Sequence, residues 1–222
     1  MSVNNTSYLP LTQWLQAQNV RLIAVSKTKT PAEIMTLYNA EQRDFGENKV
    51  QELLQKKTLL PADIHWHYIG HLQTNKVKYI APFISCIHTI DSLRLLQEID
   101  KQARSCGRTI DCMLQIFIAQ ENTKFGLTYA EATQLLENNA LALLQNIRIV
   151  GLMGMASFTD DTTRIKEEFG QLKHFFDALQ STFFADKPYF KELSMGMSGD
   201  YTIAVEQGST MVRIGSLLFG NR

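Results

Sequence analysis

The sequence lacks any long apolar run, and no stretch approaches the roughly 20 apolar residues that a membrane-spanning helix needs. The N-terminus also lacks the basic and apolar segments of a secretion signal. An excess of charge is absent too, because 22 Lys and Arg residues balance 22 Asp and Glu residues. General nucleic-acid binders carry a basic excess. We therefore expect neither a membrane nor a nucleic acid as a partner.

Cysteine is scarce: the chain has only Cys86, Cys106 and Cys112, and no two of them are spaced as C-x-x-C. An odd number without such spacing does not favour a disulfide framework. Free thiols of this kind are typical of a reducing compartment, so we expect a cytoplasmic protein. The nucleotide-binding patterns Walker A and G-x-G-x-x-G are also absent.

Histidine is concentrated in one segment, at His65, His67 and His71. Three histidines suggest a metal, yet no carboxylate or thiolate completes a plausible ligand set nearby. His65 and His67 are expected on one face of a strand, where we interpret them as packing or hydrogen-bonding residues. We predict no metal site.

What the chain does contain is a regular alternation of apolar strands and helices, after a leading helix within residues 1–20. Strands are expected at 21–27, 44–48, 65–69, 84–90, 112–118, 147–155, 189–195 and 211–214. Eight strands separated by helices, with no linker or composition break, predict an α/β protein whose residues 1–222 form a single-domain (β/α)₈ TIM barrel. A doubly wound open sheet is the alternative, since periodicity does not prove closure.

One lysine stands where a buried strand gives way to a helix. Residues 22–25 are all apolar, as in a strand covered on both faces. Thr30, Pro31 and Glu33 then form the pattern of a helix start with a capping box. Lys27 lies between these two elements, at the carboxyl end of the sheet, where α/β folds keep their chemistry. We predict that Lys27 is the central functional residue.

Two loops near the end of the chain have the residue types of a phosphate site, which barrels place after strands seven and eight. Ser198 and Gly199 precede an expected helix, and Gly215 and Ser216 follow the last strand. The alternative is that Ser198 only caps a helix and Gly215 only makes a turn. A lysine facing a phosphate pocket indicates a Schiff base with a phosphorylated aldehyde, of which pyridoxal phosphate is the common one.

These motifs resemble those of a known family. They are RLIAVSKTK, FGENKVQE, WHYIGHLQTNKVKYI, IHTIDS, GLMGM, LSMGMS and MVRIGSLLFG. Together they resemble the YggS/PROSC-type pyridoxal phosphate homeostasis proteins, from about Arg21 to the end of the chain. The resemblance implies a fold-type III barrel like the N-terminal domain of bacterial alanine racemase, which binds pyridoxal 5′-phosphate through a Schiff base.

The resemblance also implies the cofactor-binding residues, which are Lys27, Asn48, Ser198, Arg213, Gly215 and Ser216. Lys27 would form the Schiff base, Asn48 would flank the ring, and Arg213 would lie near the pyridine nitrogen. The remaining three would hold the phosphate. The chain departs from the family pattern at three positions, with Lys49 in place of tyrosine, Ser216 in place of threonine, and Tyr68 in place of phenylalanine or methionine.

Arg213 bears on whether the protein is an enzyme. An arginine stays protonated and can only donate, so it favours an unprotonated pyridine nitrogen and weakens the ring as an electron sink. The alternative for Arg213 is a structural ion pair at the barrel rim. We therefore expect a non-catalytic protein of pyridoxal phosphate homeostasis, with no catalytic residues.

Two enzymatic alternatives stay open at this point. One is a fold-type III amino-acid racemase, although such racemases carry a second β domain and this sequence ends at Arg222. The other is a sugar-phosphate barrel enzyme that uses Lys27 as an aldolase-type Schiff-base lysine. The expected partners are the small-molecule cofactor and apo-enzymes that use pyridoxal phosphate, and the expected oligomeric state is a monomer.

Overall fold

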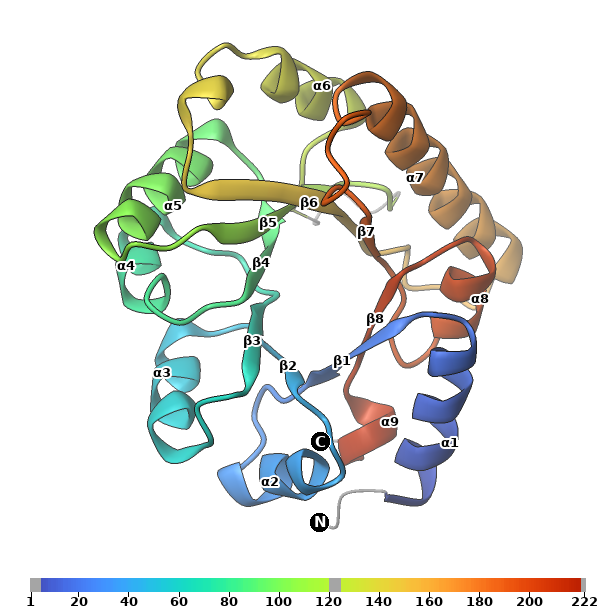
Figure 1. Cartoon of the computed structure of the whole chain (residues 1–222). Helices are drawn as coiled ribbons and strands as arrows, with labels where there is room; N and C mark the ends of the chain where they lie inside the picture. The colour runs from blue at the N-terminus through green and yellow to red at the C-terminus, as the bar shows by residue number, and fades with distance from the viewer. Residues whose placement is uncertain (1–4, 120–124, 221–222) are drawn as a thin grey trace.

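Eight parallel strands close into a barrel in the computed structural model, which describes residues 5–119 and 125–220 (Figure 1). Each strand pairs with its sequence neighbours, and β8 pairs with β1 to complete the ring. The strands are β1 (Arg21–Val25), β2 (Asp44–Glu47), β3 (His65–Tyr68), β4 (Cys86–Ile90), β5 (Ile110–Ile116), β6 (Ile147–Gly154), β7 (Glu192–Ser194) and β8 (Met211–Ile214). The predicted (β/α)₈ barrel is confirmed, and the open-sheet alternative is wrong.

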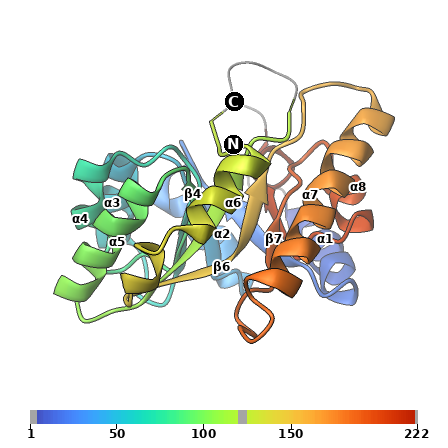
Figure 2. The same cartoon turned by 90° about the horizontal axis from the view of Figure 1, so that it is seen from above.

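Helices form an outer layer around the strands, as Figures 1 and 2 show. They are α1 (Asn5–Ala17), α2 (Pro31–Asn39), α3 (Val50–Leu59), α4 (Val77–Ile80), α5 (Leu93–Ser105), α6 (Tyr129–Glu137), α7 (Thr162–Thr182), α8 (Tyr201–Glu206) and α9 (Ser216–Phe219). Short 3₁₀ turns occupy Thr74–Lys76 and Leu141–Leu143. None of the described helices combines the length and apolarity needed to cross a bilayer.

The strand alternation sorts apolar residues into two separate clusters. Leu22 and Ala24 of β1 belong to the large cluster between strands and helices, whereas Ile23 points into the barrel. The inner cluster is small and consists of Ile23, Cys86, Met113, Val150, Met153 and Met211. Because this cluster fills only part of the interior, the remaining inward positions are available to polar side chains.

Local signals predicted helix starts well where the capping residues are neighbours in sequence. The capping boxes of Thr30 with Glu33 and of Thr128 with Glu131 are both formed. The helix α5 is capped by Ser92, whose hydroxyl accepts from the Leu95 amide.

The seventh strand is shorter than residues 189–195. Tyr189 and Phe190 precede it in a loop, where the Phe190 ring stacks on Phe184 with ring centroids 4.0 Å apart. The hydrophobicity of these residues reflects packing of their rings and not a place in the strand. Hydrophobicity alone therefore placed the start of the strand too early.

Candidate functional site

A cavity of about 580 Å³ opens at the carboxyl ends of the strands. All six predicted binding residues line it: Lys27, Asn48, Ser198, Arg213, Gly215 and Ser216. They come from the ends of β1, β2, β7 and β8, which are far apart in sequence. The barrel topology therefore brings together what the sequence predicted as one site.

The chain around Lys27 is held by a buried ion-pair network beneath it. The Lys56 amine donates to the backbone carbonyl of Ser26 at 2.7 Å and pairs with Glu47 at 2.7 Å and with Glu52 at 2.6 Å. The Ser26 hydroxyl donates to the same oxygen of Glu47 at 2.6 Å. This network fixes the residue before Lys27 to both β2 and α3, so the lysine extends from a rigid base.

The residue after Lys27 is held in an unusual backbone conformation. Thr28 has a φ of 67°, in the left-handed region that non-glycine residues adopt at a cost of about 1–3 kcal/mol. Its amide donates to the Glu52 carboxylate, which stabilises this turn. Strain of this kind is common where a chain must aim a functional side chain, and here it turns the backbone directly after Lys27.

The Lys27 amine has no hydrogen-bond or ion-pair partner among residues 5–119 and 125–220. Lys29 lines the same cavity but donates to the Phe219 carbonyl at 3.1 Å and lies 3.8 Å from Glu33. The two lysines at this mouth of the barrel therefore differ in their contacts. Lys29 ties the end of the chain to α2, whereas Lys27 is available to a ligand.

The two predicted phosphate loops meet through a hydroxyl and two amides. The amides of Gly215 and Leu217 donate to Ser198 Oγ at 3.3 and 3.4 Å, which is long for such bonds. An oxygen atom at this point therefore already faces two backbone donors. The alternative in which Ser198 caps a helix is wrong, because α8 begins later, after Asp200.

Space is tight at one of these glycines. A Cβ atom on Gly215 would lie 3.3 Å from both the Cβ and the carbonyl oxygen of Val25, which is tighter than ordinary packing. Ser216 follows at the first residue of α9 and lines the cavity. The loop after β8 thus approaches the end of β1, which brings Ser216 to the same cavity as Lys27.

Arg213 is almost completely buried, with 4% of its surface exposed. Its NH1 group donates to the carbonyl oxygen and the hydroxyl of Ser194 at 2.8 and 2.6 Å, and NH2 donates to the Gly154 carbonyl at 3.0 Å. Burial lowers the pKa of Arg213 to about 10, which leaves the guanidinium protonated near neutral pH. It forms no ion pair within the described residues, so the rim ion-pair alternative is wrong.

Asn48 reaches the cavity because a glycine lets its backbone pass close to β3. A Cβ atom on Gly70 would lie only 2.3 Å from the Asn48 carbonyl oxygen. The Tyr68 hydroxyl also donates to that carbonyl at 3.2 Å. Burial raises the pKa of Tyr68 to about 12, so its hydroxyl stays a donor. The tyrosine at this position adds a hydrogen bond that phenylalanine would not provide.

Comparison with known proteins agrees with this geometry. The family model for the N-terminal domain of alanine racemase matches residues 9–222. The pyridoxal phosphate homeostasis protein of Aquifex aeolicus is 37% identical over 203 residues, which cover 91% of this chain and 87% of that protein. This chain belongs to the pyridoxal phosphate homeostasis protein family.

Solved structures related to this family member have the same fold. PipY of Synechococcus elongatus with PLP bound is 36% identical, has a TM-score of 0.83, and aligns over 94% of this chain and 98% of its own. Alanine racemase of Clostridium difficile aligns over all of this chain and 58% of its own, with a TM-score of 0.72 and 18% identity. At that identity the racemase shows the fold alone.

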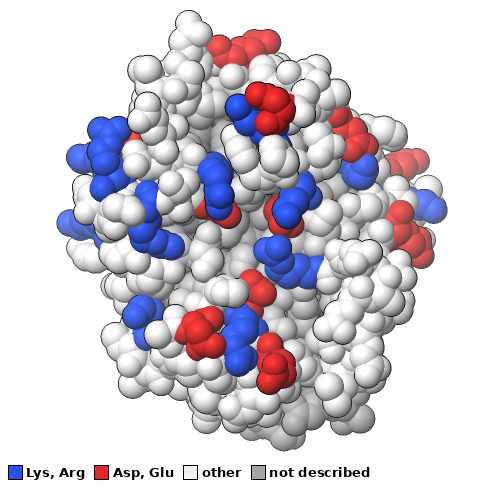
Figure 3. All heavy atoms as spheres, viewed as in Figure 1, with Lys and Arg blue, Asp and Glu red and all other residues white. Residues whose placement is uncertain are grey.

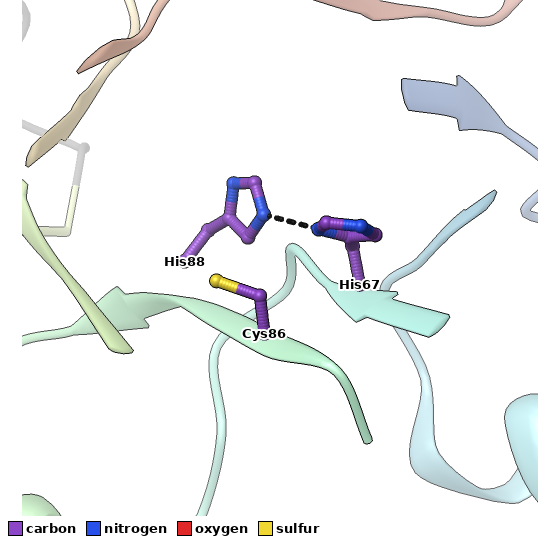
Figure 4. A group of neighbouring side chains, drawn as sticks. All are labelled: His67, Cys86 and His88. Carbon is purple, nitrogen blue, oxygen red and sulfur yellow. Dashed lines mark hydrogen bonds between the residues drawn. The ribbon is translucent and has the colours of Figure 1, made fainter. Parts of the chain in front are cut away.

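The barrel interior of this homeostasis-family protein contains two histidines whose proximity was not predicted from the sequence. His67 of β3 lies beside Cys86 and His88 of β4, and the ligand atoms of the three lie within 4.8 Å of one another (Figure 4). The expectation that no thiol or carboxylate lies near His67 is therefore wrong, since Asp44 also lies 3.0 Å from its Nε2. His71 lies elsewhere, 3.4 Å from Asp91.

His88 and Ser194 are the site residues that sequence reasoning missed. Both are fully buried, and Ser194 contacts His88 on one side and Arg213 on the other. The available signal was the two-residue period of strands, which places His88 on the same face as Cys86 and opposite Ile87. A polar residue on a buried strand face indicates a partner within the barrel, although it does not name that partner.

Proposed function

We propose that this protein binds pyridoxal 5′-phosphate in the carboxyl-end cavity and holds it as a Schiff base on Lys27. The observation that carries the proposal is the gathering of all six predicted residues around one cavity, with the Lys27 amine lacking a partner among the described residues. The names of its relatives and the PLP-bound structure of PipY support the same ligand.

The chemistry of the cavity fits the three polar parts of this cofactor. Bound there, the cofactor supplies an aldehyde that a lysine amine attacks reversibly. Ser198, Gly215 and Ser216 offer hydroxyl and amide donors to the phosphate, in a cavity whose volume is typical of small-molecule sites. Arg213 retains two of its five N–H groups without a partner in the described part of the chain, and these would donate to the ring nitrogen.

The same arginine supports a role in cofactor homeostasis without catalysis. A ring nitrogen that accepts from Arg213 remains unprotonated, and such a ring stabilises a substrate carbanion poorly. A protein built this way keeps the cofactor bound and exchangeable. The role we propose is therefore control of the free cofactor level, with release to apo-enzymes.

Absorbance and covalent mapping test the proposal. Purified protein with pyridoxal 5′-phosphate should be yellow, and borohydride reduction should fix the label on the peptide that contains Lys27. Lys27→Ala should abolish the fixed label. Lys29→Ala, which changes a lysine of the same cavity that already has partners, should keep it. A label on another residue, or no label in the wild type, would overturn the proposal.

A second measurement separates the carrier from a racemase. L-amino acids are incubated with loaded protein, and both D-isomer formation and uptake of deuterium at the α-carbon are followed. We expect slow deuterium uptake without net racemisation at enzyme-like rates, which are typically about 1–10³ per second. Racemisation at such rates that disappears in Lys27→Ala would overturn the non-catalytic part of the proposal.

A further inference from the structure

A chain of five polar side chains crosses the interior of the barrel from one mouth to the other. Asp44 lies 3.0 Å from His67 Nε2, and His67 Nδ1 lies 2.9 Å from His88 Nε2 (Figure 4). His88 Nδ1 lies 3.2 Å from Ser194 Oγ, which accepts from Arg213 at 2.6 Å. Asp44 and His67 line a second cavity at the amino ends of the strands, whereas Arg213 lines the cofactor cavity.

The two ends of this chain, with neutral imidazoles between them, set the direction of every hydrogen bond in it. Arg213 can only donate, and an ionised Asp44 can only accept. The His67 Nε2–H group therefore donates to Asp44, which leaves His67 Nδ1 to accept from His88 Nε2–H. His88 Nδ1 must then accept from the Ser194 hydroxyl, whose lone pair faces Arg213. With both imidazoles neutral, each ring carries its proton on Nε2.

The charge environment agrees with this assignment. Burial holds the pKa of His88 well below its usual value, so this ring is neutral near pH 7. Burial acts to raise the pKa of Asp44, but its interactions with His67, and then with Arg21, outweigh it and leave the pKa below its usual value. Asp44 is therefore ionised, as the chain requires.

A metal ion held by His67, Cys86 and His88 is the competing interpretation, and the geometry disfavours it. Two nitrogens that both bind one zinc ion at 2.0–2.1 Å in a tetrahedron lie about 3.3 Å apart. The two ring nitrogens here are 2.9 Å apart, as in a hydrogen bond. The Cys86 thiol is also fully buried, and burial raises its pKa well above the usual value, so it remains a thiol.

The chain decides how Arg213 faces the cofactor cavity. Because the Ser194 hydrogen is committed to His88, the hydroxyl oxygen presents a lone pair to the guanidinium. That bond and the two carbonyl bonds use three of the five N–H groups of Arg213, and two remain for the cavity that this residue lines. We propose that His67 and His88 are positioning residues, which orient Arg213 toward the ring of the bound cofactor through Ser194. This inference rests on the proposed function.

The first arm of the test needs no cofactor. Nitrogen-15 spectra of histidine side chains in cofactor-free protein report which ring nitrogen carries the proton. We expect His67 and His88 both to be neutral Nε2–H tautomers in the wild type. Asp44→Asn, which replaces an acceptor by a group that can also donate, should shift the tautomer populations of both rings. Cys86→Ser is the control, because this buried neighbour lies outside the chain and should leave both spectra unchanged.

The second arm measures binding at the far end. Asp44→Asn lies at the opposite mouth from Lys27, yet it should weaken binding of pyridoxal 5′-phosphate by about threefold to thirtyfold, the range of coupling between linked residues. Binding of inorganic phosphate, which has no ring nitrogen, should not change. Cys86→Ser should bind both ligands as the wild type does.

The outcomes of the two arms separate this inference from the proposed function. Charged rings or Nδ1–H tautomers in the wild type would overturn the chain even if the cofactor binds at Lys27. A zinc-induced change of both rings that is lost in Cys86→Ser would establish the metal site and overturn it as well. Equal weakening of phosphate and cofactor by Asp44→Asn would show a general structural effect. Failure of the wild type to bind the cofactor would overturn the proposed function and, with it, the role given to Arg213.

Discussion

The two mouths of the barrel carry similar numbers of charged side chains but use them differently. At the amino ends, Arg21 pairs with Glu192 at 3.2 Å and Arg148 with Asp111 at 2.7 Å. Figure 3 shows basic side chains next to acidic ones around the central hollow of this face. At the carboxyl ends, Lys27 has no partner among the described residues. The carboxyl mouth is therefore the end at which an unpaired charge can still contribute binding free energy to a ligand.

The physical basis of the difference is that a charge already held in an ion pair gains little from binding a further charged group. An ion pair at the amino mouth stabilises the fold modestly and offers a ligand little. A cation held on a rigid backbone without a partner can bind an anion or react with an aldehyde without first breaking a bond. Barrels in general place their chemistry at the carboxyl mouth, and the unpaired Lys27 lies at that mouth.

The comparison is sharpest between two lysines of the carboxyl mouth. Lys56→Met should reduce the free energy of unfolding by about 3–5 kcal/mol, because it leaves the buried Glu47 carboxylate without its cation. Lys27→Met, whose amine has no bond to lose within the described chain, should cost less than about 1 kcal/mol. Urea unfolding followed by circular dichroism measures both.

Two further variants control for charge itself. Lys166→Met removes a lysine from the exposed face of α7 and should leave stability unchanged within about 0.5 kcal/mol. Adding Glu47→Gln to Lys56→Met should restore part of the loss, since burial already raises the pKa of Glu47. If Lys56→Met lowered the free energy of unfolding no more than Lys27→Met does, the division between paired and unpaired lysines would be contradicted.

Much of this site was predictable because its signals are local in sequence. The capping box after Lys27 and the serine and glycine loops after the last two strands are each contained in a few residues. The barrel then follows from the regular order of strands. What could not be predicted depends on contacts across the barrel: the hydroxyl of Ser198 against the Gly215 amide, and His88 against Ser194, which is 106 positions away.

The phosphate loops should show the next largest effect, and only on binding. Ser198→Ala and Ser216→Ala should each weaken binding of pyridoxal 5′-phosphate by about 1–3 kcal/mol, as expected for a lost hydrogen bond to a charged group. Pyridoxal, which lacks the phosphate, should bind weakly and respond little to either change. Fluorescence titration with both ligands measures this. Equal affinity for the two ligands in the wild type would show that these loops do not hold a phosphate.

The polar chain between the mouths should make stability depend on pH. His88 is neutral in the fold, with a pKa well below 6.5, while the unfolded chain takes up a proton near pH 6.5. The unfolded state therefore binds more protons as the pH falls below 6.5, and the free energy of unfolding should decrease by roughly 1 kcal/mol per pH unit there. His88→Gln should reduce this slope. His174→Gln, on the exposed face of α7, should keep the wild-type slope.

The exposed ion pair of the amino mouth should give the smallest effect, and it tests the comparison between the two mouths most directly. Arg148 is half exposed and its partner Asp111 is partly exposed, so their ion pair is screened by water. Arg148→Met should therefore lower the free energy of unfolding by no more than about 1 kcal/mol and leave cofactor affinity unchanged. High salt should reduce the difference from the wild type further, because screening weakens exposed pairs. A loss of cofactor affinity as large as that of Ser198→Ala would mean that this exposed ion pair also contributes to binding, and that pairing of charges does not separate the two ends.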